Sequence, residues 1–289
     1  MKFGSVEVPE HIDFTFPNTH PDTVSVLSTY KNDKKSTIFV GCAKWNKTDL
    51  KGFYPKGTKD ELTYYASQFN SIELNATFYR MFSANQFTTW YNKTPEGFRF
   101  YPKIYQEISH WKRLKETQRV IDEYLFNVSH LKEKLGTIFL QMHDNFSPKD
   151  FDSLIHFVEK WPKKFPLAIE LRHSNWYNNN TIATQLFEFF EDNNITNIIV
   201  DTAGRRDIMH MRLTNASAFV RYVGCNHISD YKRLDDWVEC LKLWIEQGLK
   251  EIHFFIHQNI EKESPLLSAY FIKKLNFELG CALTIPNNN

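Results

Sequence analysis

The chain has 289 residues, of which 42% are hydrophobic and 24% are charged, and its formal net charge is +1. This length suits one large barrel-type domain or two small ones, and the hydrophobic content argues against wholesale disorder. A near-neutral charge gives no global attraction to nucleic acid or to an anionic membrane, so nucleic acid is not favoured as a partner.

The four cysteines form no C-x-x-C pair, which excludes a zinc ribbon and a thioredoxin motif. We therefore expect reduced thiols and a cytoplasmic location. No run of about 18 apolar residues occurs, and the first residues lack the apolar stretch of a signal peptide. A membrane span is not expected.

The chain alternates between short apolar runs and segments with helical spacing after a polar start. Residues 1–35 contain proline and lack periodicity, which predicts an N-terminal extension on the surface of a domain formed by residues 36–289. The apolar runs predict strands at residues 36–43, 71–77, 98–104, 136–142, 167–172, 197–203, 218–224 and 251–259. The intervening segments predict helices at residues 58–69, 83–93, 115–134, 148–160, 181–192, 234–247 and 265–275.

Eight strands with a helix between most successive pairs predict an α/β fold, a single-domain (β/α)8 barrel of the TIM type. The nearly continuous apolar runs are typical of parallel strands that are buried on both faces. A doubly wound open sheet is the alternative. The absence of G-x-G-x-x-G after the first strand, and of G-x-x-x-x-G-K-[ST] anywhere, weakens nucleotide-binding folds.

The segment SIELNATFYR at residues 71–80 has an unusual polar face. Glu73, Asn75 and Thr77 alternate with apolar residues, which is the periodicity of a strand. If both faces of this strand are covered, these polar groups lie in an enclosed space and need hydrogen-bonding partners.

Functional groups of such barrels gather at the carboxyl ends of the strands, where the loops meet. Two glutamates, Glu73 and Glu170, are the candidate acid–base residues. The candidate substrate-binding residues at these predicted ends are Trp45, Asn75, Thr77, Tyr79, Lys103, His110, Gln141, Arg172, His173, Trp176, Asp201, Arg221 and His257. An internal Glu–Arg or Glu–Lys network that only fills the barrel is an equally supported interpretation of Glu73.

Arg172, Arg221 and Lys103 predict binding of an anion, because guanidinium and ammonium groups recognise phosphate and carboxylate. The alternative is that each balances a carboxylate inside the barrel. We therefore expect an enzyme of hydrolase or isomerase type that acts on a small anionic or phosphorylated substrate. A non-catalytic binding or accessory protein for a metabolite, a nucleic-acid end or a protein partner is the alternative.

No cofactor is expected, and a divalent metal is a weaker alternative. Histidines at three strand ends and several carboxylates could in principle ligate such an ion, but the chain has no H-x-H on a strand and no H-E-x-x-H. The tryptophans Trp45, Trp111 and Trp176 follow strands, and packing is favoured over ligand stacking for at least two of them. Cys42 is interpreted as a buried thiol.

A series of motifs resembles the YecE-like family, a domain of unknown function (DUF72), in the same order along the chain. The motifs are GCAKW, the FYP loop at residues 53–55, SIELNATFYR, FRFYPK with ISH, GTIFLQM, LAIELRHSNW, the strand that ends in Asp201, and VRYVG. The resemblance covers about residues 39–275. It implies a TIM-type barrel and supplies no activity.

The family's motif positions fall on Gly41, on Phe78 and on every candidate site residue above except His257. Two departures lie at the predicted mouth of the barrel. Family members usually have Thr-Ser-Gly where this chain has Cys42-Ala43-Lys44, and an Asn pair where it has His257-Gln258-Asn259. The ligand of this chain therefore need not be that of its relatives.

Overall fold

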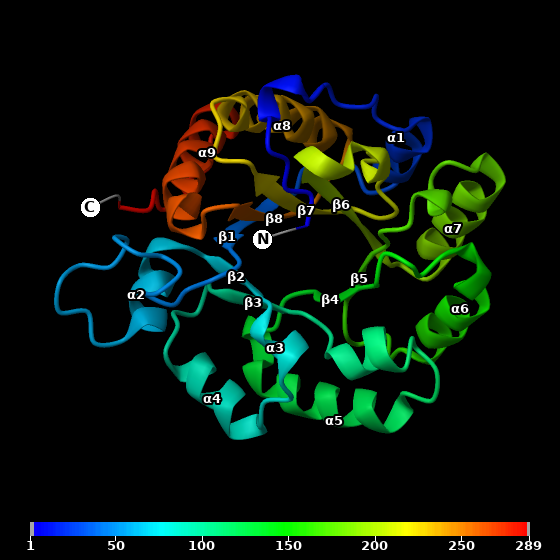
Figure 1. Cartoon of the computed structure of the whole chain (residues 1–289), viewed down its shortest axis with the longest axis horizontal. Helices are drawn as coiled ribbons and strands as arrows, with labels where there is room; N and C mark the ends of the chain where they lie inside the picture. The colour runs from blue at the N-terminus through cyan, green and yellow to red at the C-terminus, as the bar shows by residue number, and fades with distance from the viewer. Residues whose placement is uncertain (1–2, 288–289) are drawn as a thin grey trace.

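The computed structural model describes residues 3–287 as a curled parallel sheet with helices around its outer side (Figure 1). Six strands form one parallel sheet in the order β1-β8-β7-β6-β5-β4, and β2 and β3 form a second, two-stranded parallel sheet. The strands are β1 (Thr37–Cys42), β2 (Ser71–Leu74), β3 (Arg99–Pro102), β4 (Ile138–Gln141), β5 (Leu167–Glu170), β6 (Thr196–Thr202), β7 (Ser217–Gly224) and β8 (Glu251–Gln258). All predicted strands are therefore present, and the sequential strand order is not that of a doubly wound sheet.

Helices connect the strands and cover the outer face of the sheet (Figure 1). They are α1 (Pro21–Ser28), α2 (Glu61–Gln68), α3 (Ala76–Tyr79), α4 (Ala84–Asn92), α5 (Gln118–Val128), α6 (Phe151–Lys160), α7 (Asn180–Asp192), α8 (Ser229–Gln247) and α9 (Ser264–Leu279). Short 3-10 or π turns are η1 (Pro9–His11), η2 (Glu107–Trp111), η3 (Ser129–Lys134), η4 (Pro148–Asp150), η5 (Ser174–Trp176), η6 (Ala203–Ile208) and η7 (Glu261–Glu263). Within residues 3–287, no helix combines the length and apolarity that crossing a membrane requires.

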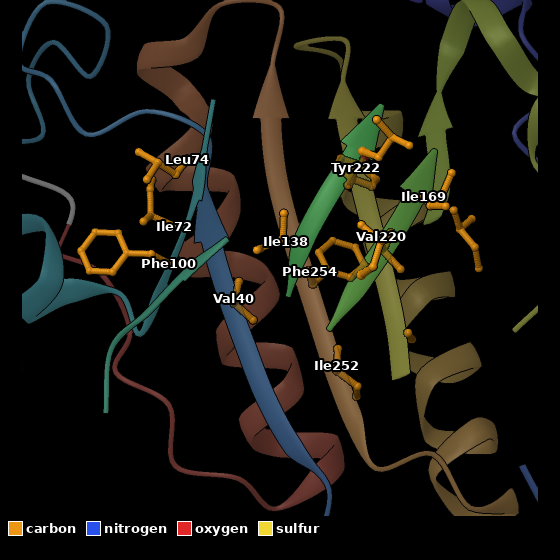
Figure 2. Close-up of a cluster of buried hydrophobic side chains, with 14 of the residues drawn as sticks. Val40, Ile72, Leu74, Phe100, Ile138, Ile169, Val220, Tyr222, Ile252 and Phe254 are labelled. Carbon is orange, nitrogen blue, oxygen red and sulfur yellow. The ribbon is translucent and has the colours of Figure 1, made fainter. Parts of the chain in front are cut away.

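Both faces of the strands are buried, which explains their continuous apolar sequences. Side chains such as Val220 and Phe254 belong to the large core between the sheet and the helices (Figure 2). Their neighbours Phe219 and Phe255 belong to a separate inner cluster, on the other side of the same strands. Alternate side chains of β7 and β8 therefore pack into two different cores.

At both of their edges, the two sheets are joined by isolated bridges or side-chain hydrogen bonds and not by a continuous β-ladder. Between β3 and β4 there are isolated parallel bridges at Phe100–Leu135 and Lys103–Phe139. Between β1 and β2, the side chain of Asn70 donates to the carbonyl oxygen of Ile38 (2.8 Å) and accepts from the amide of Val40 (2.9 Å). The continuous ladder thus spans six strands, and not the eight of the predicted barrel.

Several element boundaries differ from the predictions. The second strand ends at Leu74, because Asn75 takes up the helical conformation (φ −71°, ψ −20°) and α3 follows, so the predicted alternation through Thr77 is wrong. The helix predicted at 115–134 is divided into α5 and η3, and Lys132 interrupts it at a φ of 50°. The extension, predicted to lie on the surface, contains α1, whose Leu27 is fully buried.

The first described residues of the extension lie at the carboxyl ends of β5 and β6. The carbonyl oxygen of Gly4 accepts from the amide of Gly204 (2.8 Å) and from the hydroxyl of Thr202 at the end of β6 (3.2 Å). Phe3 lies against the guanidinium of Arg172, 3.6 Å from its ring centroid. The extension therefore covers part of the predicted mouth.

Candidate functional site

A buried ion-pair cluster at the carboxyl ends of the strands joins β2, β5 and β7. Arg221 on β7 binds Glu73 on β2 with two nitrogens, Nε to Oε2 (2.9 Å) and Nη2 to Oε1 (2.7 Å). Its third nitrogen, Nη1, donates to Oε2 of Glu170 on β5 (2.5 Å). Glu73 and Glu170 have no solvent exposure, and Arg221 is 3% exposed. One guanidinium therefore links two carboxylates from strands of the two different sheets.

Each carboxylate has further partners. Asn75 donates to Glu73 Oε1 (2.7 Å), and Arg172 donates to Glu170. His257 lies with its Nε2 at 3.1 Å from Glu73 Oε2, and Nε2 is the donor because a carboxylate only accepts. Both glutamates are therefore occupied by protein partners.

The two glutamates are ionised at neutral pH. Burial by itself raises the pKa of Glu73, but Arg221 and His257 outweigh it and hold the pKa well below its usual value. In Glu170, burial is likewise outweighed by Arg172 and Arg221, which lower the pKa to about 2. A carboxylate in this state is a poor acid and a weak base, so the structure favours a structural and electrostatic role for both.

Lys103 is the buried amine of the site and follows β3 directly. Its Nζ donates to Oε1 of Gln141 on β4 (2.6 Å) and lies 4.1 Å from the ring centroid of Phe78. No Asp or Glu within residues 3–287 forms an ion pair with this ammonium group. Burial lowers the pKa of Lys103, and the positive charges of Arg221 and Arg172 lower it further, to about 7.

The site is richer in basic than in acidic groups. Arg172, Arg221 and Lys103 are three basic side chains beside the carboxylates of Glu73 and Glu170. Nδ1 of His257 is buried and has no hydrogen-bond partner within the part of the chain that the structure describes. When Lys103 is protonated, the cluster carries one positive charge more than it has carboxylates, and an added anion would balance it, because buried charges need partners of opposite sign.

Three more of the predicted residues adjoin this cluster. His110 on η2 lies against Phe78 (4.8 Å between ring centroids), and its Nδ1 is 2.8 Å from the Ser109 hydroxyl oxygen. Burial, followed by the charge of Lys103, lowers the pKa of His110 to about 4. Thr77 hydrogen-bonds the carbonyl oxygens of Leu74 (2.8 Å) and Lys103 (2.7 Å), so it fixes the backbone beneath the amine. Gln141 completes the group through its contact with Lys103.

Asp201 does not join the cluster, although it lies near the end of β6. Its carboxylate accepts from Arg233 (2.7 Å) and from Nε1 of Trp237 (2.8 Å), both on α8, and from Arg206. Ile198 and Val200 belong to the inner cluster, so the alternation of the strand turns Asp201 outward. Its contacts anchor α8 to the sheet.

The remaining predicted residues also lie outside the cluster. Trp176 is fully buried and donates to the carbonyl oxygen of Phe146 (2.7 Å), and Trp45 packs against Trp90. Tyr79 is 69% exposed. His173 accepts from the amide of Asn175 (3.2 Å) at the start of η5. These contacts are those of packing and turn residues.

Sequence reasoning did not single out Phe3, which lies on Arg172. No periodicity or motif marks this residue, because its neighbours in the chain are polar and irregular. Phe78 is marked in the sequence by its position in a family motif. Its contact with Lys103 was not predictable, because it depends on the turn of the chain after Leu74. Within residues 3–287, no three His, Cys, Asp or Glu side chains come together in a way that would hold a metal ion.

Comparison with known proteins agrees with the fold. The family model described as "Protein of unknown function DUF72" matches residues 39–288. The UPF0759 protein YecE of Escherichia coli K12 is 24% identical over 277 residues, which cover 87% of this chain and 98% of that protein. The UPF0759 protein YunF of Bacillus subtilis is 26% identical over 149 residues, 48% of this chain and 52% of that protein.

Two solved structures are similar to this one. A DUF72 family protein from Enterococcus faecalis superposes with a TM-score of 0.67 at 22% identity, covering 83% of this chain and 98% of that one. A DUF72 family protein from Thermotoga maritima gives a TM-score of 0.65 at 25% identity, covering 83% of this chain and 99% of that one. Together with the match of the family model over most of its length, these likenesses show that the chain belongs to the DUF72 family of proteins of unknown function.

Proposed function

We propose that the cluster at the carboxyl ends of the strands binds a small anion, either a phosphorylated metabolite or a carboxylate, and that the protein is an enzyme acting on it. The observation that carries this proposal is the charge of the cluster, in which three basic side chains meet two carboxylates. Arg172 is the cation closest to solvent, because its side chain is 12% exposed and that of Arg221 is 3% exposed. Arg172 and Lys103 therefore receive the ligand, and Arg221 holds the two glutamates.

The reaction class that we propose is hydrolysis or isomerisation, both of which need a proton donor or acceptor beside an anion-binding group. Lys103 has a pKa of about 7, which places it in the range for proton transfer at neutral pH. The glutamates would affect the pKa of this amine and of Arg221, and would not transfer protons themselves.

Non-catalytic binding is the second candidate, and a specific observation favours it. Both glutamates expected to do acid–base chemistry are already bound by Arg221, Arg172 and His257. A cluster of this kind could hold a metabolite or the end of a nucleic acid without turnover. Turnover of any ligand found would decide between the two candidates.

We also propose that β2 and β3 complete the wall of an eight-stranded barrel, the closed form expected from the sequence. The bridges from β3 to β4 and the bonds of Asn70 to β1 support this, because they occupy the two gaps in the ladder. In that arrangement the cluster lies at the carboxyl end of the barrel, where such folds have their sites.

The test is a thermal-shift series with inorganic phosphate, phosphorylated sugars, nucleotides and sugar acids. A ligand that binds only the folded state raises the melting temperature according to RT ln(1 + [L]/Kd). We expect a rise in the wild type that is lost in Arg172→Ala. In that variant Glu170 keeps its bond from Arg221, so the cluster retains a partner for each carboxylate.

Arg119→Ala is the matched control, because Arg119 is an exposed arginine on α5. Its thermal shifts should equal those of the wild type. Equal shifts in Arg172→Ala, or no shift with any of these anions, would overturn the proposed anion site. The second result would direct the search to a macromolecular partner.

A further inference from the structure

Lys103 is an unusual lysine because its amine is buried and no carboxylate within residues 3–287 forms an ion pair with it. The residue is 8% exposed, and the partners of its Nζ are a neutral amide oxygen of Gln141 and the face of Phe78. Its main-chain carbonyl oxygen is fixed separately, by the hydroxyls of Thr77 (2.7 Å) and Tyr124 (3.0 Å). The position of the amine is therefore set by the fold and not by an ion pair.

The charged and titratable groups around the amine come from four parts of the site. They are Arg221 on β7, Arg172 and Glu170 at the end of β5, Glu73 on β2 and His110 on η2. Burial is the largest cause of the fall in the pKa of Lys103 to about 7, and Arg221 and Arg172, whose effects are larger than those of Glu170 and Glu73, also lower it. At neutral pH a large part of Lys103 is the free amine, which is the nucleophilic form.

We propose that Lys103 is a nucleophilic amine that forms an imine with a small carbonyl compound whose phosphate or carboxylate is held by Arg172. This inference rests on the anion site proposed above and narrows its ligand to a carbonyl-bearing anion. Gln141 and Phe78 keep the amine in place, and neither occupies the lone pair of the free amine, because Gln141 accepts one of its N–H bonds and Phe78 contacts it only through the ring face.

The reaction needs no oxidant, reductant or metal. The nitrogen lone pair of Lys103 attacks the carbonyl carbon, a C–N bond forms, and the carbonyl oxygen takes up a proton. Loss of that oxygen as water then gives the imine, with one amine and one carbonyl consumed for each imine and water formed. Such an intermediate acidifies the neighbouring C–H bond, which fits the isomerisation proposed above and not the hydrolysis.

Reductive trapping of the imine on the intact chain tests the proposal. The protein is incubated with glyceraldehyde 3-phosphate or with glyoxylate, sodium cyanoborohydride is added, and peptide mass spectrometry locates the adduct. The reagent supplies hydride to the imine carbon, so the modified lysine gains the mass of the carbonyl compound less one oxygen atom. We expect this adduct on Lys103 at least tenfold above any other lysine, with a yield that rises through pH 7.

The two probes separate the sources of the anion, since one carries a phosphate and the other a carboxylate. Lys134 is the internal control, because it is also a buried lysine with a lowered pKa, but precedes β4 and donates to backbone oxygens of Tyr91 and Thr94. Its peptide should remain unmodified. Lys103→Arg keeps a cation at the site and should abolish the adduct, and excess inorganic phosphate should suppress it in the wild type.

An adduct spread evenly over surface lysines, or no adduct on Lys103 with either probe, would overturn the imine proposal. Because the modified peptide is mapped in the wild type, this result does not depend on whether Lys103→Arg folds. A thermal shift with phosphate that is lost in Arg172→Ala, but without any adduct, leaves the anion site intact and refutes only the imine. Absence of both results would refute the two proposals together.

Discussion

At the scale of single residues, Glu73 shows how a candidate catalytic group is bound into the structure. Its carboxylate accepts from Arg221, His257 and Asn75, with no exposure to solvent. Glu73→Gln preserves the shape of the side chain but leaves the charge of Arg221 with one carboxylate fewer. Removing one partner of a buried ion pair costs about 3–5 kcal/mol, so we expect a loss of this order in the free energy of unfolding, measured with urea.

Glu123→Gln provides the matched control, because Glu123 is exposed on α5. A change within about 0.5 kcal/mol is expected there. If Glu73→Gln were equally mild and also abolished a ligand-dependent thermal shift, Glu73 would be a ligand-binding group and not chiefly a partner of Arg221.

Lys103 gives the wild type a characteristic pH dependence. Its pKa is lowered in the folded state from 10.5 to about 7, so the unfolded chain binds more protons between these values and stability rises with pH. Relative to Lys103→Met, the wild type should gain up to about 1.4 kcal/mol of unfolding free energy per pH unit in this window. Urea unfolding at several pH values between 7 and 10 measures the difference.

The same series with Lys115→Met, which removes an exposed lysine, is the control and should give a difference that does not vary with pH. A flat difference for Lys103→Met as well would mean that the Lys103 amine is protonated throughout the range. That outcome would also remove the basis for its nucleophilic role.

At the scale of elements, the contact between β1 and β2 depends on Gly41. A Cβ at this position would lie 2.2 Å from the carbonyl oxygen of Ser71, which is backbone and cannot turn away. Gly41→Ala should therefore force β1 and β2 apart and destabilise the protein by about 1–3 kcal/mol, as overpacking does. Hydrogen exchange of the Val40 amide, which donates to Asn70 on this edge, should become faster.

Gly97→Ala is the matched control, because a Cβ there would meet no atom within 4 Å. It should leave both the stability and the exchange of Val40 close to those of the wild type. Unchanged exchange in Gly41→Ala would show that β1 and β2 tolerate a wider separation than their present contact.

The elements also show which predictions the sequence supports and why others fail. The strands were predictable because most of them are short apolar runs, and of the two partners expected for an internal glutamate, arginine or lysine, the structure shows arginine. That the partner of Glu73 is Arg221 was not readable, because β2 and β7 are not adjacent and no periodicity relates them. Asp201 was predicted to lie at the mouth, and this was not correct. Because Ile198, Ile199 and Val200 are all apolar, the sequence does not reveal which face of β6 carries Asp201.

At the scale of the whole molecule, the N-terminal segment is part of the site's boundary. Arg206 donates to the carbonyl oxygens of Phe14 (3.2 Å) and Thr15 (3.3 Å), and the guanidinium of Arg233 lies 4.6 Å from the ring centroid of Phe14. These contacts hold the segment across the ends of β6 and β7, and Phe3 extends it to Arg172. Ligand access to Arg172 therefore depends on residues at the start of the chain.

Phe3→Ala should make Arg172 more reactive towards phenylglyoxal, a reagent that modifies accessible guanidinium groups. A cation–π contact contributes about 0.5–2 kcal/mol, which corresponds to a roughly two- to thirtyfold faster modification of Arg172 when the ring is removed. Peptide mass spectrometry over a time course measures the rate, with the exposed Arg119 as the internal standard. Val8→Ala, which shortens an exposed side chain of the same segment, should leave the rate unchanged. Equal rates for Arg172 in the wild type and in Phe3→Ala would mean that the segment opens freely in solution, and access to the cluster would then be controlled by other residues.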